Sequence, residues 1–191
     1  MSSFLYVGGI VLEIIKENDK TYPEKLRQIY DRPAKLYVKG NIDILNNKSI
    51  AIIGSRNCSK YGMEVAYKFG YGLAKKGITI ISGLARGIDA YSHWGTVKAN
   101  GKAIAVLGSG FNNIYPKENI GLYKEIIKNG GASLVTKLTG QHASASLGLR
   151  IAFFPISNDS GDAAHCSSFS YRKPLKSVGG YHGHAACTLL E

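Results

Sequence analysis

Four short apolar runs recur at similar intervals along the middle of the chain, and each of the first three is followed by a glycine-containing turn. A segment with helical periodicity separates each run from the next. Strands that are apolar on both faces and alternate with helices are typical of β-α-β units in a parallel sheet. The pattern therefore predicts an α/β fold with a Rossmann-like, doubly wound and mainly parallel sheet. The predicted strands are 49–53, 78–81, 103–107 and 133–135, and the predicted helices are 63–76, 88–99 and 117–129.

Residues 1–48 precede this pattern and are predicted to form an N-terminal lead-in segment. Proline fits the first turn of a helix, so a short helix is expected over 24–30, directly after Pro23. Residues 36–38 are expected to be extended. A chain of 191 residues is long enough for one large hydrophobic core. We therefore assign residues 49–191 to a single Rossmann-like core.

The turns after the first three runs are expected at one edge of the sheet, because open α/β sheets bind ligands beyond the carboxyl ends of their strands. Glycine lets a ligand approach the backbone, and helix N-termini present N–H groups that favour phosphate. Arg56 and Arg86 add planar donor groups suited to phosphate oxygens. Glycines that only form tight turns are the alternative for any single turn. The predicted phosphate-binding residues are Gly54, Ser55, Arg56, Ser82, Gly83, Arg86, Gly87, Gly108, Ser109 and Gly110.

The known nucleotide-binding motifs do not occur in the sequence. Gly108 and Gly110 lack the third glycine of a dinucleotide fingerprint, because Asn113 stands in its place. Residues 95–102 have five residues between the two glycines, where a P-loop has four. Ser109 lacks the preceding glycine of a nucleophile elbow. We therefore expect no cofactor and no nucleotide hydrolysis.

The cysteines and histidines do not form a recognised metal motif. Cys58, Cys166 and Cys187 are an odd number without Cys-x-x-Cys spacing, which favours free thiols over a disulfide scaffold or a zinc ribbon. His182, His184 and Cys187 are residue types that bind zinc, but their spacing matches no closed motif. A disordered tail is the preferred interpretation, and no metal is predicted.

The chain is strongly basic. Its 24 Lys and Arg residues against 13 Asp and Glu give a formal charge of +11, which indicates a polyanionic partner. Most of this excess, 19 basic against 10 acidic residues, precedes Asn129. The N-terminus has no basic stretch ahead of its apolar run, and no segment reaches the roughly 20 apolar residues that span a bilayer. We expect a cytoplasmic protein without a membrane span.

The order and spacing of the motifs resemble the DprA/Smf family, from Tyr22 to about Val135. Upstream of the core, residues 22–26 and 36–40 are similar to the family's lead-in to its first core strand. The segment with the sequence SGLARGID is specific, whereas Gly-Ser-Arg alone is a weak signal. The segments that carry the resemblance are 51–56 (AIIGSR), 82–89 (SGLARGID), 105–110 (AVLGSG) and the dipeptide Tyr115-Pro116.

The resemblance implies a Rossmann-like protein that binds single-stranded DNA and delivers it to the bacterial strand-exchange recombinase, RecA, during natural transformation. It implies no catalysis, and a homodimer is left open. Asp89 and His93 lie four residues apart on one predicted helix. We interpret Asp89 as a cap or turn former, and His93 as a packing residue or pocket wall, rather than as an acid–base pair. Tyr115 either stacks on a base or only shapes the turn before the last helix.

The resemblance fails after Val135, so residues 136–191 match poorly. The family continues with Phe-Pro-x-Arg-Asn-Arg, but here Ser157 and Asp159 stand at the two arginine positions. Lys176-Ser177 recurs at about the family's distance from Pro155, and Lys176 is therefore an additional DNA-binding candidate. Our hypothesis is that the C-terminal third is diverged, frameshifted or truncated, which predicts a sheet that is incomplete at the C-terminus.

Two other functions compete with single-stranded DNA binding. One is a nucleotide-processing enzyme on a related fold, such as the phosphoribohydrolases of the lonely-guy family. Those enzymes use a Pro-Gly-Gly-x-Gly-Thr loop, which this sequence does not contain. The other is an inactive remnant that still folds in part.

Overall fold

The computed structural model describes residues 3–7, 10–28, 30, 32–136, 168–170 and 185–190. The described strands are β1 (Ser3–Val7), β2 (Ile10–Lys16), β3 (Lys35–Gly40), β4 (Ser49–Gly54), β5 (Thr79–Ser82), β6 (Ala103–Val106), β7 (Ala132–Val135), β8 (Ser168–Ser170) and β9 (Ala185–Leu190). The helices are α1 (Glu24–Arg27), α2 (Lys60–Lys75), α3 (Ile88–Lys98) and α4 (Ile120–Lys128), with 3-10 helices η1 (Ile42–Asn46) and η2 (Lys117–Asn119).

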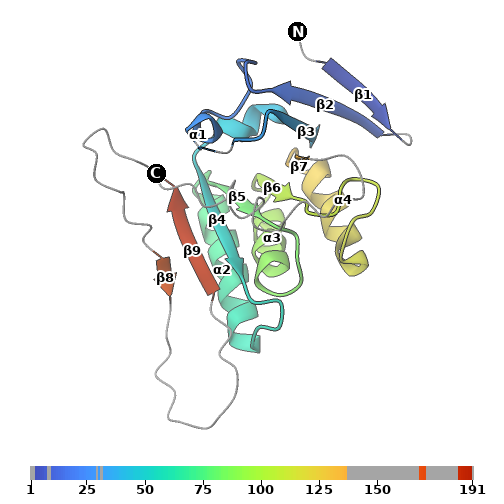
Figure 1. Cartoon of the computed structure of the whole chain (residues 1–191). Coiled ribbons are helices and arrows are strands. Elements are labelled where there is room, and N and C mark those ends of the chain that lie inside the picture. Colours follow the sequence, from blue (N-terminus) through green and yellow to red (C-terminus); the bar gives the residue numbers. More distant parts are fainter. Residues whose placement is uncertain are drawn as a thin grey trace, which may run out of the picture.

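All of these strands belong to one sheet with the order β1-β2-β3-β7-β6-β5-β4-β9-β8 (Figure 1). The four central strands, β4 to β7, are parallel. The strands on either side of them are antiparallel to their neighbours. The predicted α/β class with a Rossmann-like parallel core is therefore confirmed, and antiparallel strands extend that core at both sides.

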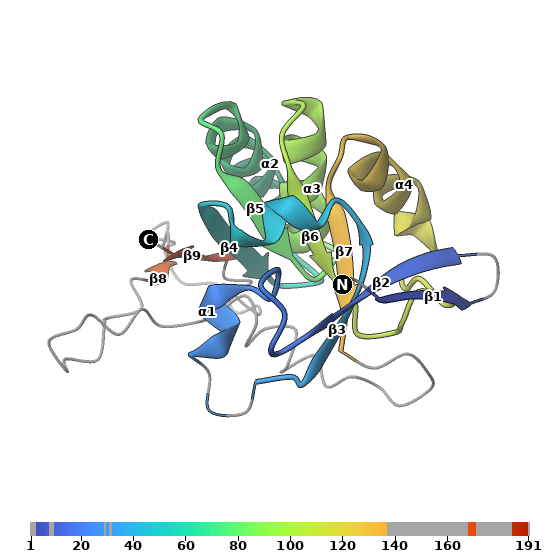
Figure 2. The same ribbon diagram turned by 90° about the horizontal axis from the view of Figure 1, so that it is seen from above.

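The three crossover helices α2, α3 and α4 lie side by side on one face of the sheet (Figure 2). The central strands follow each other in chain order across the sheet, and right-handed crossovers then place every helix on the same face. In β6, Ala103 and Ala105 pack toward these helices, whereas Ile104 and Val106 belong to the opposite face. Among the described residues, the second layer therefore comes from the N-terminal segment and not from further crossover helices.

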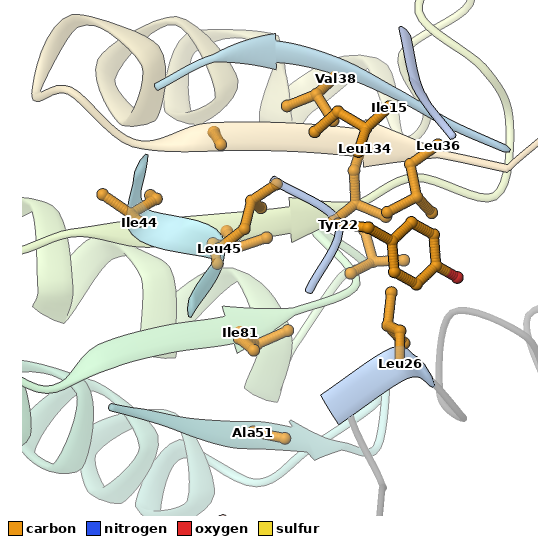
Figure 3. Close-up of a cluster of buried hydrophobic side chains, with 13 residues drawn as sticks. Ile15, Tyr22, Leu26, Leu36, Val38, Ile44, Leu45, Ala51, Ile81 and Leu134 are labelled. Atoms are coloured by element: carbon orange, nitrogen blue, oxygen red, sulfur yellow. The ribbon is translucent and has the colours of Figure 1, made fainter. Parts of the chain in front are cut away.

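The N-terminal segment covers that opposite face with its own apolar side chains. Tyr22, Leu26, Ile44 and Leu45 are buried in one cluster with residues of the central strands, and Figure 3 shows them gathered against the sheet. The segment also adds strands, because β3 pairs with β7, and β2 with β3. Residues 1–48 thus contribute directly to the core that the later residues form.

Six of the predicted core elements coincide with observed ones to within three residues at each end, and the predicted helix 117–129 is divided into η2 and α4. The helix predicted over 24–30 is shorter, since α1 ends at Arg27. The hairpin of β1 and β2 was not predicted. Its sequence signal is the pair Gly8-Gly9 between two apolar runs, a combination typical of two-residue hairpins.

In the described part of the chain, no helix is long and apolar enough to cross a membrane.

Helices α2 and α3 approach each other so closely that their backbones touch. A Cβ atom added to Gly70 would lie 2.1 Å from the carbonyl oxygen of Ser92, and one added to Gly95 would lie 2.1 Å from that of Tyr67. Ala66 and Ala74, one turn to either side of Gly70, are also buried. Small side chains on α2 therefore set the distance between the two helices.

We predict that Gly70→Ala lowers the free energy of unfolding by about 1–3 kcal/mol, because the methyl group must push the two backbones apart. Gly72→Ala is the matched control, since a Cβ there meets nothing within 4 Å. The control should raise stability by about 0.5–1 kcal/mol, because alanine is the better helix former. Urea denaturation of both variants measures the two effects, and equal effects of the two substitutions would contradict the close helix contact.

Candidate phosphate-binding edge of the sheet

The three glycine-containing turns follow adjacent parallel strands and lie at the same edge of the sheet. The strands β4, β5 and β6 end at Gly54, Ser82 and Val106, and they are neighbours in the sheet. In Figure 1 this is the lower edge, toward which the arrow of β4 points and from which α2 rises. The structure therefore brings together the turns that the sequence predicted at one edge.

The carboxylate of Asp89 joins the first two of these turns. Asp89 lies in the first turn of α3 and is only 6% exposed. Its Oδ1 atom accepts a hydrogen bond from the backbone N–H of Gly54 at 3.2 Å, and its Oδ2 atom accepts one from Gly83 at 3.1 Å. This confirms the interpretation of Asp89 as a turn-forming residue.

Burial raises the pKa of the Asp89 carboxyl above its ordinary value, and backbone N–H groups of Gly54, Gly83 and Ala85 oppose this shift. A carboxyl whose pKa is higher in the folded chain stabilises the fold most when protonated, and this contribution is lost as the pH rises through the folded pKa. The hydrogen bonds from Gly54 and Gly83 favour the charged form of the carboxyl and so act against the effect of burial.

Gly87 brings the second turn into contact with the first. It has a φ of +73° at the N-terminus of α3, a backbone conformation that favours glycine. A Cβ atom at this position would lie 2.2 Å from the carbonyl oxygen of Ser55. The next residue, Ile88, donates its N–H to the same oxygen at 3.3 Å. Gly87 is thus required for the packing of the two turns, whether or not a ligand approaches it.

The first turn presents Arg56 to solvent. Within the described residues, no hydrogen bond or ion pair of the Arg56 guanidinium is found, and the residue is exposed. The hydroxyl of the half-buried Ser55 accepts the N–H of Asn57 at 3.2 Å, which shapes the turn. Arg56 therefore has five guanidinium N–H groups available at this edge.

Arg86, in the second turn, is engaged by Glu118 of η2. Its Nε atom lies 2.6 Å from Oε1 of Glu118, and its Nη2 atom lies 3.0 Å from Oε2. Both side chains are about half exposed, at 52% and 55%. The sequence predicted a guanidinium that is available to phosphate, whereas the structure shows one held by two hydrogen bonds to a carboxylate.

The remaining predicted residues differ in how far a ligand could reach them. Ser82 is buried, and its hydroxyl donates to the carbonyl oxygen of Ile52 at 2.6 Å, so this side chain joins β5 to β4. In the third turn, Gly108 is exposed and Ser109 is half-buried, while Gly110 is buried with a φ of +79°. Lys176 lies outside the described residues.

Sequence reasoning missed Asn119, which ties η2 to the second turn. This buried side chain donates its amide hydrogens to the carbonyl oxygens of Leu84, at 2.9 Å, and Ala85, at 3.2 Å. The only sequence signal was an asparagine at a helix start shortly after Tyr115-Pro116.

Tyr115 is 58% exposed, so both predicted roles, stacking on a base and shaping the turn, stay predictions.

His93 is fully buried in α3, which agrees with its interpretation as a packing residue. Within the described residues, neither of its ring nitrogens has a hydrogen-bond partner that meets normal geometry. Burial lowers the pKa of His93 to about 4. The imidazole is therefore neutral at pH 7 and is not an acid–base partner of Asp89.

No group of three or more His, Cys, Asp or Glu residues suited to a metal ion occurs among the described residues. His182 and His184, which belong to the alternative metal site, lie outside the part of the chain that the structure describes.

The parallel core with glycine-containing turns at its carboxyl edge places the chain in the class of Rossmann-like α/β proteins. Within this class, residues 13–147 match the model of the DNA recombination-mediator protein A family. Because this match covers well over half of the sequence, the chain belongs to that family.

Several curated proteins are similar to this chain. It is 40% identical over 119 residues to DNA processing protein DprA of Bacillus subtilis (strain 168), which covers 62% of this chain and 40% of that protein. It is 45% identical over 101 residues to DprA of Streptococcus pneumoniae, which covers 53% of this chain and 36% of that protein. The chain thus spans about two fifths of the length of these relatives.

Two solved structures resemble the fold. The X-ray structure of DprA from Streptococcus pneumoniae has a TM-score of 0.65 and 36% identity, over 74% of this chain and 50% of that one. A structure of DprA from Helicobacter pylori, described for its single-stranded DNA binding mode, has a TM-score of 0.57 and 26% identity, over 72% of this chain and 56% of that one.

We predict that Asp89→Asn lowers the free energy of unfolding by about 1–3 kcal/mol. An amide offers only one acceptor oxygen, so one of the two glycine N–H groups faces the NH2 group and loses its partner. Asp43→Asn, at an exposed position of η1, is the matched control and should change stability by less than about 0.5 kcal/mol. Thermal or urea denaturation of both variants measures the two effects. An unchanged free energy of unfolding in Asp89→Asn would contradict the bridging role of the carboxylate.

We also predict that the contribution of His93 to stability falls as the pH is lowered from 7 to 5. The unfolded chain protonates His93 near pH 6.5, whereas the folded chain does so only near pH 4. Lowering the pH through this window therefore favours the unfolded state, by up to about 3 kcal/mol in total. His93→Leu should fold at pH 7 and lose this part of the dependence in urea titrations at the two pH values. An unchanged pH dependence in the variant would show that other groups cause it.

Proposed function

We propose that this chain binds single-stranded DNA at the carboxyl edge of the sheet, as part of a recombination mediator. The observation that carries the proposal is Arg56, an exposed guanidinium beside the backbone of two glycine turns that Asp89 holds together. Backbone N–H groups and arginine bind phosphate oxygens in any sequence context. Binding should therefore depend on the sugar-phosphate backbone and hardly on the bases.

The charge of the chain and its relatives support this proposal. A formal charge of +11 favours a polyanion, and such binding weakens as salt is added because counterions are released from the nucleic acid. The Helicobacter pylori DprA structure, which is similar over 72% of this chain, is described for its single-stranded DNA binding. We further propose that the protein is cytoplasmic and that it protects incoming DNA during natural transformation.

Loading of the recombinase RecA is the finer part of the proposal. It rests on family membership, because no described residue identifies a recombinase-binding surface. A homodimer is proposed on the same basis. Both can be tested by mixing the DNA-bound chain with RecA and by measuring the mass of the free chain in solution.

The family is one of mediators, and we therefore propose a binding protein rather than an enzyme. Among the described residues, the best acid–base candidates have other tasks, since Asp89 accepts two backbone hydrogen bonds and His93 is buried and neutral. Turnover of a nucleoside monophosphate by the purified chain would favour the alternative of a nucleotide-processing enzyme.

We predict that Arg56→Ala weakens the binding of oligo-dT roughly ten-fold at low salt, and equally for other base sequences, because a phosphate contact is lost. Fluorescence anisotropy titrations at several salt concentrations measure this, and the variant should show a smaller salt dependence. Lys68→Ala, which removes an exposed charge from the middle of α2, is the control and should bind nearly as the unchanged protein does. Equal affinities of Arg56→Ala and the unchanged protein would exclude Arg56 from the site.

A further inference from the structure

The ion pair of Arg86 and Glu118 lies at the edge where DNA is proposed to bind. Two nitrogen atoms of the guanidinium face two oxygen atoms of the carboxylate, which is the same two-point geometry with which arginine binds a phosphate group. The hydrogen bond from Arg86 lowers the pKa of Glu118, so the carboxylate is charged at neutral pH. A phosphate and Glu118 therefore compete for the same donor atoms.

The pair is not needed to hold η2 against the second turn. That connection is made by the neighbouring Asn119, whose buried amide donates to the carbonyl oxygens of Leu84 and Ala85. An ion pair as exposed as that of Arg86 and Glu118 contributes little to stability. Asn119 thus fixes the position of the Glu118 backbone. The Glu118 carboxylate is not needed to hold η2 in place.

Arg56 and Arg86 differ in whether a carboxylate holds their guanidinium group, although each follows a strand that ends at the same edge of the sheet. Arg56 has no hydrogen-bond or ion-pair partner among the described residues, whereas the Nε and Nη2 atoms of Arg86 both donate to Glu118. A DNA phosphate that reaches this edge meets the Arg56 guanidinium, which no described residue occupies, and it can bind the Nε and Nη2 atoms of Arg86 only after the Glu118 carboxylate has left them.

We propose that Glu118 acts as an internal competitor of DNA phosphate at Arg86 and so sets the affinity of this edge for single-stranded DNA. The inference rests on the proposed function. In the free protein, Glu118 takes the place of a phosphate group at Arg86, and DNA gains this contact only by displacing the carboxylate.

The test is a titration of oligo-dT with Glu118→Gln, followed by fluorescence anisotropy at several salt concentrations. The glutamine keeps the size of the side chain and removes its charge. We expect roughly two- to five-fold tighter binding at low salt, the factor that corresponds to an exposed ion pair. The slope of the logarithm of affinity against the logarithm of salt should become steeper by about 0.7, the value for one more neutralised phosphate of a single strand.

Two controls separate the competition from a general effect of charge. Glu64→Gln removes one exposed negative charge from α2 and should increase the affinity less than Glu118→Gln does. Arg86→Ala should abolish the gain, so that Arg86→Ala and the double variant with Glu118→Gln bind equally. The thermal stability of Glu118→Gln should stay within about 1 °C of the unchanged protein, because the pair contributes little to folding.

The inference is overturned if Glu118→Gln binds no more tightly than the unchanged protein, or if its gain persists without Arg86. It is also overturned if Glu64→Gln gives the same gain. In each of these cases the unchanged protein still binds oligo-dT, and the proposed function stands. Absence of binding by the unchanged protein and all variants contradicts the proposed function, and the role of Glu118 falls with it.

Discussion

The hydrogen bonds of one buried carboxylate, Asp89, determine the geometry of the proposed binding edge. They connect the backbone N–H groups of Gly54, the last residue of β4, and Gly83, which follows β5, to the first turn of the helix that packs behind both strands. Such a group is unfavourable in the interior unless its acceptors are satisfied. The arrangement of the two turns therefore depends on the folding of the core. The positions of the side chains that project from these turns depend on it as well.

Much of the fold could be predicted from the sequence, because apolar runs that alternate with amphipathic helices leave few architectures open. The strands of the parallel core and their connecting helices are where the pattern placed them. The N-terminal hairpin of β1 and β2 was missed, since short strands without a strict alternation carry a weak signal. The doubly wound prediction also missed that the crossover helices lie on a single face of the sheet. That arrangement follows from the strand order, which runs in chain order from β4 to β7. A local sequence pattern does not reveal the order of strands.

The site could be predicted only as a set of turns. Residue types and spacing indicated that glycines and arginines gather at one edge, and the structure agrees. They could not indicate that Ser82 directs its hydroxyl into the sheet, or that Arg86 is paired with Glu118, because these contacts join residues up to 32 positions apart. Asn119 was missed for the same reason, since a single asparagine at a helix start has many ordinary roles. Whether these residues bind DNA stays a prediction.

The contact between the glycine faces of α2 and α3 also concerns the arginines, because each helix begins shortly after one of them. Backbones in direct contact at Gly70 and Gly95 cannot slide past each other without separating. The spacing between the two arginine-bearing turns is consequently preset in the free protein. A flexible polyanion would be ordered on a surface that is already in place, and the loss of conformational entropy on association would fall almost entirely on the ligand.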